Sequence, residues 1–368
     1  MIARWSIRFL LAAALLSAAG CATPGPLEQI PISQHDVDAF LASGKDARNF
    51  GITIYQDAAG ARFEFANRVH QDRGAQMDFN SPRDLPVPVI KARTGTFVHF
   101  NLLLDSSARQ NWLLLQSVEA MDYRTFAPPT GEYADHIVSE VPGYAGVGNK
   151  IVLDALHVES PIFYVPPAAG NLGPLARVER EAENEEEALA RHALGARTHA
   201  VMGAALMRSF AYVRFDFLAR SIRFSSHSTY QPANPAAVVA SLPLRDWRGR
   251  PAVQATLDGK PLLLVIDTAG DFDLALPGEP AADSGSLALG ALQIDAVPLA
   301  SHAGLGLPEA FPARLGLRFL SRYALVLDHK HQRVWFEDDS TSADVEEDSA
   351  TAAEEENPPP VQYRGIRP

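Results

Sequence analysis

Short apolar runs alternate with polar turns along most of the chain, a pattern that predicts β-strands rather than long helices. Two runs differ because they are continuously apolar and each ends in a carboxylate: Asn101–Asp105 reads NLLLD and Leu262–Asp267 reads LLLVID. An acid at the end of a buried strand is costly unless it is hydrogen-bonded or functional. Each of these two acids therefore needs a structural partner or a chemical role.

Further strands are predicted on both sides of each acid because apolar and polar residues alternate there. They lie in a hairpin over Gly51–Val69, in Leu85–Leu104, Ile151–Pro166 and Pro251–Asp267, and in two hairpins that end at Phe224 and Phe336. The clearest helix is predicted over Arg177–Leu194, where strong helix formers are followed by the stop signal Gly195. A short helix is also expected near Asp36–Leu41. The chain is therefore predicted to be mainly β.

The two acid-ended strands belong to an internal repeat whose period is too long for a solenoid. LLDSSA around Asp105 aligns with VIDTAG around Asp267, and the apolar-apolar-Gly segments that end at Gly203 and Gly316 also align. The acid and the glycine are 98 residues apart in the first half and 49 in the second, so the first half carries an insertion that holds the predicted helix. Matching hairpins close the halves, at Met207–Phe224 and Leu320–Phe336.

Charge is concentrated at the end of the chain. Glu337–Pro368 contains ten acids and two bases, so it carries −8 of the net charge of −12 and leaves only −4 for the residues before it. No broad basic face is implied, and this makes nucleic acid an unsuitable partner. The tail is rich in Ser and Ala and cannot bury enough apolar area to order itself, so we expect it to be disordered.

The beginning of the chain has the features of an export signal. The apolar run Phe9–Leu16 follows two arginines and is too short for an ordinary membrane span. Ala18-Ala19-Gly20 then leads into Cys21, the only cysteine. This resembles a bacterial lipoprotein signal, which implies cleavage before Cys21 and lipidation of its thiol; an ordinary secretory peptide with a chance cysteine is the alternative. Ala22, rather than Asp, implies sorting to the outer membrane, so we expect a lipid-anchored protein of the bacterial cell envelope that faces the periplasm.

Each half of the repeat resembles a retropepsin-like aspartic peptidase unit, and the two in tandem resemble a pepsin-type arrangement over roughly Leu85–Glu337. The resemblance lies in the apolar strand that ends in Asp-Ser or Asp-Thr, the later apolar-apolar-Gly segment, and the closing Phe-Leu-Ser-Arg-Tyr hairpin. It implies a mainly β fold with two β-barrel lobes related by a pseudo-two-fold axis, a few short helices and one inserted helix.

On this resemblance the chain divides into six segments. They are a lipoprotein signal peptide (1–20), a tether with a small N-terminal β region (21–84), a first aspartic-peptidase-like lobe (85–225), a linker (226–245), a second such lobe (246–337) and the acidic tail (338–368).

The chemistry that the resemblance implies needs two carboxylates facing each other, and because both cannot ionise cheaply at close range they share a proton. One carboxylate activates a water and the other protonates the peptide carbonyl, without a metal, another cofactor or a covalent intermediate. Asp105 and Asp267 are the predicted catalytic pair, because they are the only acids at matching positions in the acid turns of both halves. The resemblance implies that the hydroxyls of Ser106 and Thr268 lock the two turns together.

The next residue in each turn departs from the family pattern. The family has Gly there, whereas this chain has Ser107 and Ala269, with Gly270 one residue late. A Cβ at these positions is tolerated only while φ stays negative. Two functions therefore stay open: an envelope-anchored aspartic-type endopeptidase, and a non-catalytic lipoprotein of this fold that binds a peptide or protein partner.

Other residues are weaker candidates than the acid pair. The resemblance implies a flap over the substrate, for which Pro142–Gly148 is the candidate, with Tyr144 at its tip; an ordinary glycine-rich loop is the alternative. His329 and His331 alternate as metal ligands can, but the polar sequence around them indicates a surface turn. Ser106 lacks the sequence of a nucleophile elbow. No metal and no other cofactor is therefore predicted.

Overall fold

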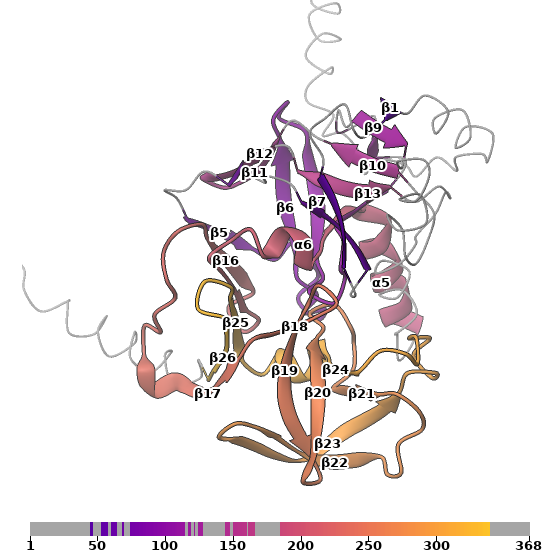
Figure 1. Ribbon diagram of the computed structural model, residues 1–368, viewed down its shortest axis with the longest axis vertical. Helices are drawn as coiled ribbons and strands as arrows, with labels where there is room; N and C mark the ends of the chain where they lie inside the picture. Colours follow the sequence, from indigo (N-terminus) through magenta and orange to yellow (C-terminus); the bar gives the residue numbers. More distant parts are fainter. Residues whose placement is uncertain are drawn as a thin grey trace, which may run out of the picture. The chain divides into compact units, whose positions relative to one another are not determined.

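The fold is mainly β in the part of the chain that the structure describes (Figure 1). The computed structural model describes residues 45–46, 53–57, 60–64, 68–69, 74–114, 117–118, 121, 124–127, 144–147, 150–159, 161–165 and 185–338. All of them belong to one compact unit, Ile32–Pro368. Cys21, the helix expected near Asp36–Leu41 and the acidic tail from residue 339 lie outside the described residues.

An eleven-stranded sheet is built from the first half of the chain. In spatial order its strands are β1 (Lys45–Asp46), β9 (Arg124–Ala127), β10 (Tyr144–Val147), β13 (Ile162–Val165), β8 (Trp112–Leu113), β14 (Thr198–Met202), β7 (His99–Leu104), β6 (Val89–Thr94), β11 (Lys150–Leu153), β12 (Leu156–Glu159) and β4 (Arg68–Val69). The predicted early hairpin is confirmed separately, as β2 (Thr53–Asp57) paired with β3 (Gly60–Glu64).

A seven-stranded sheet is built from the second half. In spatial order its strands are β18 (Arg245–Trp247), β19 (Arg250–Leu257), β20 (Lys260–Ile266), β24 (Ala313–Leu315), β21 (Leu274–Leu276), β23 (Leu292–Ser301) and β22 (Ser284–Leu289). An additional pairing of β22 with β19 closes six of these strands into a barrel. The second half therefore forms a β-barrel lobe, as the resemblance implies.

A six-stranded sheet joins the two halves. Its order is β17 (Val238–Pro243), β26 (Arg333–Glu337), β25 (Ala324–Asp328), β15 (Tyr212–Asp216), β16 (Ser221–Ser225) and β5 (Gly74–Asp78). The two predicted closing hairpins are confirmed, and they meet where β15 pairs antiparallel with β25. Each half also contributes one outer strand, so the sheet repeats the internal symmetry of the sequence.

The register around the two acids shows the same symmetry. β14 lies parallel to β7 with Met202 opposite Leu104, and β24 lies parallel to β20 with Leu315 opposite Ile266. The N–H of Asp105 donates to Met202 at 3.0 Å, and the N–H of Asp267 donates to Leu315 at 2.9 Å. These matched contacts confirm the predicted fold class of two β-barrel lobes related by a pseudo-two-fold axis.

The described part of the chain contains three α-helices and one 3₁₀ helix. α6 (Ala204–Met207) and α7 (Leu317–Leu320) follow the two apolar-apolar-Gly segments, the 3₁₀ helix spans Pro235–Ala237, and the inserted helix α5 spans Glu185–Arg197. Among the described residues, no helix combines the length and apolarity needed to cross a membrane.

One prediction about these elements was wrong, and the predicted linker proves to contain a strand. Gly195 does not end the inserted helix, which continues to Arg197; burial of Leu194 and the hydrogen bond that Thr198 Oγ1 donates to its carbonyl offset the cost of a helical glycine. The predicted linker, 226–245, contains strand β17, because an alternating segment after its prolines pairs with β26.

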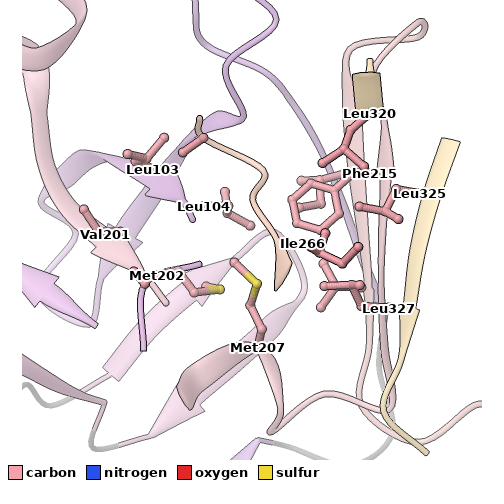
Figure 2. Packing of buried hydrophobic residues seen from close by; sticks show 14 of the residues in the cluster. Leu103, Leu104, Val201, Met202, Met207, Phe215, Ile266, Leu320, Leu325 and Leu327 are labelled. Atoms are coloured by element: carbon pink, nitrogen blue, oxygen red, sulfur yellow. The ribbon is translucent and has the colours of Figure 1, made fainter. Parts of the chain in front are cut away.

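The strands that carry the two acids end in one shared core. Figure 2 shows Leu104 from the first half on the side of Ile266 from the second, with Phe215 and Leu327 of the closing hairpins beside Ile266. Leu104 and Ile266 are fully buried, and each directly precedes one of the candidate acids. The hydrophobic run before each acid therefore fixes the turn that follows it.

Candidate functional site: the paired acid turns

The two acid turns, Asp105–Ala108 and Asp267–Gly270, are tied to each other by four hydrogen bonds. The N–H of Ser106 donates to Thr268 Oγ1 at 3.0 Å, and the N–H of Thr268 donates to Ser106 Oγ at 3.2 Å. Ser106 Oγ donates in turn to the carbonyl of Ile266 at 2.7 Å, and Thr268 Oγ1 donates to that of Leu104 at 2.9 Å. The two hydroxyls thus occupy the locking positions that the resemblance implies.

The predicted pair, Asp105 and Asp267, lies in these turns with both carboxylates at 0% exposure. Asp105 Oδ1 accepts from the N–H of Ser107 at 2.8 Å, from Ser107 Oγ at 2.7 Å and from the N–H of Ala108 at 3.1 Å. Asp267 Oδ1 accepts from the N–H groups of Ala269 and Gly270, at 3.3 and 2.9 Å. Backbone donors aimed at both acids stabilise two buried carboxylates in equivalent positions.

Side chains in place of the family glycine cause no backbone strain. Ser107 and Ala269 are absent from the residues with positive φ, so each carries its Cβ in an ordinary conformation. The glycine that comes one residue late has its own reason: a Cβ at Gly270 would lie 2.5 Å from the ring of Phe272 and 2.9 Å from Asp267 Oδ2. The second turn is therefore built around Gly270 instead of a glycine at position 269.

Arg314 is a residue of this site that sequence reasoning missed. It lies in β24 with its side chain 5% exposed, and its Nη1 is 3.3 Å from Asp267 Oδ2 and 3.4 Å from Ser107 Oγ. Because Ser107 Oγ also donates to Asp105, the two acid turns are connected by way of Ser107 and Arg314. A signal was present in the repeat, where Arg314 aligns with the apolar Val201.

A second buried arginine reaches the same turn. Arg250 Nε donates to the carbonyl of Ser107 at 2.7 Å. The guanidinium carbons of Arg250 and Arg314 lie 4.8 and 4.7 Å from the centre of the Phe311 ring. Cation–π contacts of this kind are favourable when the cations are desolvated. The site thus contains two guanidiniums beside its two carboxylates.

The crossing of each acid turn by its apolar-apolar-Gly segment needs a residue without a side chain. A Cβ at Gly203 would lie 2.2 Å from the carbonyl oxygen of Gln110, and one at Gly316 would lie 2.2 Å from that of Phe272. The N–H of Gly203 donates to Asn111 Oδ1 at 2.9 Å. Close backbone approach therefore explains both aligned glycines.

Replacement of Gly203 by alanine is expected to lower the free energy of unfolding by about 3 kcal/mol, because the clash is with main-chain atoms that cannot rotate away. Gly95→Ala is the matched control, since the atoms nearest its Cβ belong to the Lys150 side chain, with Cγ at 2.8 Å, and not to the main chain; we expect a loss of about 1 kcal/mol or less. Urea denaturation followed by circular dichroism measures both. Similar losses in the two variants would contradict the assignment of Gly203 to a close crossing.

A buried cluster of one acid and two arginines connects the inserted helix to the residue that follows the second acid turn. Asp271 accepts from Arg191 of α5 and from Arg318 of α7, with Arg318 Nε 3.0 Å from Asp271 Oδ1. Arg191 is 1% exposed and ranks among the largest fully buried side chains. The inserted helix therefore supplies a basic residue, Arg191, that anchors it to the second half.

Two titratable groups of the second half have shifted pKa values. Burial raises the pKa of Asp273, partly opposed by Arg322 and Arg318 and assisted by Asp271. Burial also lowers the pKa of His302, and the nearby charge of Arg314 lowers it further. Burial and the neighbouring cation both favour the neutral form of His302.

The remaining candidate residues belong to other elements than the acid turns or lie outside the described residues. Tyr144 begins strand β10, which is paired on both sides by β9 and β13, so the backbone there belongs to a sheet rather than to the tip of a hairpin. His331 Nδ1 lies 2.9 Å from the buried Asp328 in the last hairpin turn. Burial lowers the pKa of His329 to about 4. Cys21 lies outside the described residues.

The chain is similar to solved structures, although no sequence comparison identifies a family. No protein-family model matches the chain, and no curated protein sequence matches it. The crystal structure of basic 7S globulin from soybean is similar with a TM-score of 0.43 and 11% sequence identity, over 74% of this chain and 96% of that one. The fold class rests on the sheets and registers described above.

Proposed function

We propose that this protein is a non-catalytic member of the aspartic-peptidase-like fold that binds a peptide or protein partner. The observation that carries the proposal is the ion pair of Arg314 with Asp267. Hydrolysis needs the outer oxygens of the two carboxylates to share a proton and a water. Asp267 Oδ2 instead accepts from a guanidinium, which keeps its protons at any physiological pH.

Burial supports the same proposal. Both carboxylates are at 0% exposure, whereas attack on a peptide requires the acid pair to contact a water and the substrate carbonyl. The four hydrogen bonds between the turns remain, so the acids and hydroxyls act as a buried connection between the halves. Binding of an extended chain is then the part of the family's function that this architecture can retain.

The proposed location follows from the sequence. The small residues before Cys21 support a lipid anchor on that residue, and Ala22 supports sorting to the outer membrane with the body facing the periplasm. An anchored body that binds peptides there would meet exported proteins and their segments. We propose no nucleic-acid partner and no metal or other cofactor.

An aspartic-type endopeptidase is the second candidate, because the reciprocal bonds of Ser106 and Thr268 hold the acid turns as that activity requires. We expect the soluble chain without its signal and lipid to leave casein and a pool of unstructured peptides intact from about pH 3 to about pH 7, the range in which an acid pair would act. Mass spectrometry of the peptides measures this, with circular dichroism as the control for folding.

Cleavage by the wild-type protein that disappears in both Asp105→Asn and Asp267→Asn would overturn the non-catalytic assignment and establish the endopeptidase. The binding half of the proposal is tested on immobilised protein with a pool of capped synthetic peptides. Equilibrium retention of part of the pool is expected. If the folded protein retains none of the pool, the binding function is wrong.

A further inference from the structure

Strand β5 is the outermost strand of the six-stranded sheet (Figure 1). One edge pairs antiparallel with β16. The other edge forms no ladder with a described strand and meets β6 only at its end, through a bridge between Phe79 and Ile90. The N–H of Phe79 donates to Arg220 of the β16 side at 2.7 Å, and the N–H of Asn80 donates to Val89 of the β6 side at 2.6 Å. Because successive residues of an antiparallel strand point their N–H and C=O groups to opposite edges, those of Gln76 and Asp78 face away from β16.

A hollow lies beside this edge. β5 belongs to the six-stranded sheet and β6 to the eleven-stranded sheet. An isolated bridge between Phe79 and Ile90 links the two strands. The space beside them has a volume of about 520 Å³. It is lined by residues of four strands and their adjoining turns: Gln76, Met77, Asp78, Phe79, Asn80, Lys91, Arg93, His99, Val152 and Asp154.

The lining combines buried apolar side chains with charged ones of both signs. Met77, Phe79 and Val152 are buried or half-buried. Lys91, Arg93 and His99 project from the neighbouring hairpin and form no ion pair with any described residue. Asp78 and Asp154 also border the hollow, so at neutral pH two cations, Lys91 and Arg93, stand beside two carboxylates, and His99 adds an imidazole.

We propose that this hollow binds an extended peptide segment of a partner protein, which adds to β5 as a further strand and places an acidic side chain against Lys91, Arg93 and His99. An open strand edge recognises the backbone of any extended segment, and the side-chain pockets beside it provide the selectivity. The proposal rests on the binding function proposed above and gives that function a place separate from the acid turns.

The test uses a capped, fluorescein-labelled peptide of alternating valine and glutamate. Its binding to the soluble chain without signal and lipid is measured by fluorescence polarisation. Gln76→Pro removes an N–H that faces the hollow and leaves the bonds to β16 in place. We expect it to raise Kd about tenfold or more, because the peptide loses one hydrogen bond and meets the proline ring instead. Gln76→Ala is the matched control: it removes the same side chain, keeps the N–H, and is expected to bind as the wild type does.

Two altered peptides separate the parts of the proposal. Methylation of alternate backbone nitrogens is expected to abolish binding, because it removes the donors that pair with β5, and replacement of glutamate by lysine is expected to weaken binding about tenfold. Equal affinity of Gln76→Pro and Gln76→Ala, or the absence of saturable binding by the valine–glutamate peptide, would overturn the site.

Two further outcomes are distinguishable. Concentration-dependent self-association that Gln76→Pro abolishes would assign the β5 edge to a second copy of the chain and overturn the peptide proposal. Retention of the general peptide pool by both wild type and Gln76→Pro would preserve the proposed binding function and place it elsewhere on the protein. Hydrogen exchange of each variant shows whether the strand is still paired with β16.

Discussion

Replacement of Arg314 by valine is expected to lower the free energy of unfolding by about 3–5 kcal/mol, because it removes the guanidinium that faces a buried carboxylate. Valine is the residue at the matching position of the first half, Val201, so the strand itself accepts it. The loss of stability therefore comes from leaving the Asp267 carboxylate without its cation, and not from a lower strand propensity. Urea denaturation of the wild type and the variant gives the difference in the free energy of unfolding, provided that this free energy falls with urea concentration at the same rate in both.

The partner variant separates the ion pair from packing. In Arg314→Val/Asp267→Asn neither member of the pair carries a charge, and we expect the double variant to be more stable than Arg314→Val alone, since no carboxylate is then buried beside an apolar residue. A double-mutant cycle measures the coupling. If Arg314→Val costs less than about 1 kcal/mol, the range of exposed ion pairs, then Arg314 is not a structural partner of Asp267 and the non-catalytic assignment loses its main support.

The strands could be predicted because each half repeats the same local pattern. A continuous apolar run before an acid and an alternating closing hairpin are visible in the sequence, and their repetition identifies equivalent elements. β17 was missed because the prolines before it suggested a linker, although the strand itself alternates. The end of α5 was missed because the cost of Gly195 is local, whereas the burial that offsets it comes from the rest of the fold.

The candidate site was predicted only where its residues belong to the repeat. Asp105, Asp267 and their neighbouring hydroxyls stand at matching positions, and the structure brings them together. Arg314 and Arg250 break the symmetry, and their contacts join residues far apart in the sequence. The alignment of Arg314 with an apolar residue was a usable signal, since a charge inside a buried strand needs a partner as much as the acids do.

The ion pair between Arg191 of the inserted helix and Asp271 is the basis of the second large expected loss of stability. Arg191→Met keeps the length and apolar stem of the side chain but removes its charge, and we expect a loss of about 3 kcal/mol because Asp271 is buried. The matched control is Arg318→Met, which removes the other guanidinium on the same carboxylate. Arg318 is 38% exposed, so its ion pair is screened by solvent and should cost about 1 kcal/mol or less.

The two arginines also differ in what they hold in place, and this gives a second readout. Arg191 connects α5, part of an insertion in the first half, to the turn that follows Asp267, whereas Arg318 lies in the same half as Asp271. Hydrogen exchange in Arg191→Met should therefore speed up in α5 more than in α7, while Arg318→Met should leave α5 unchanged. Equal acceleration of both helices in Arg191→Met would mean that the substitution weakens the whole fold, and that α5 is not anchored through this ion pair.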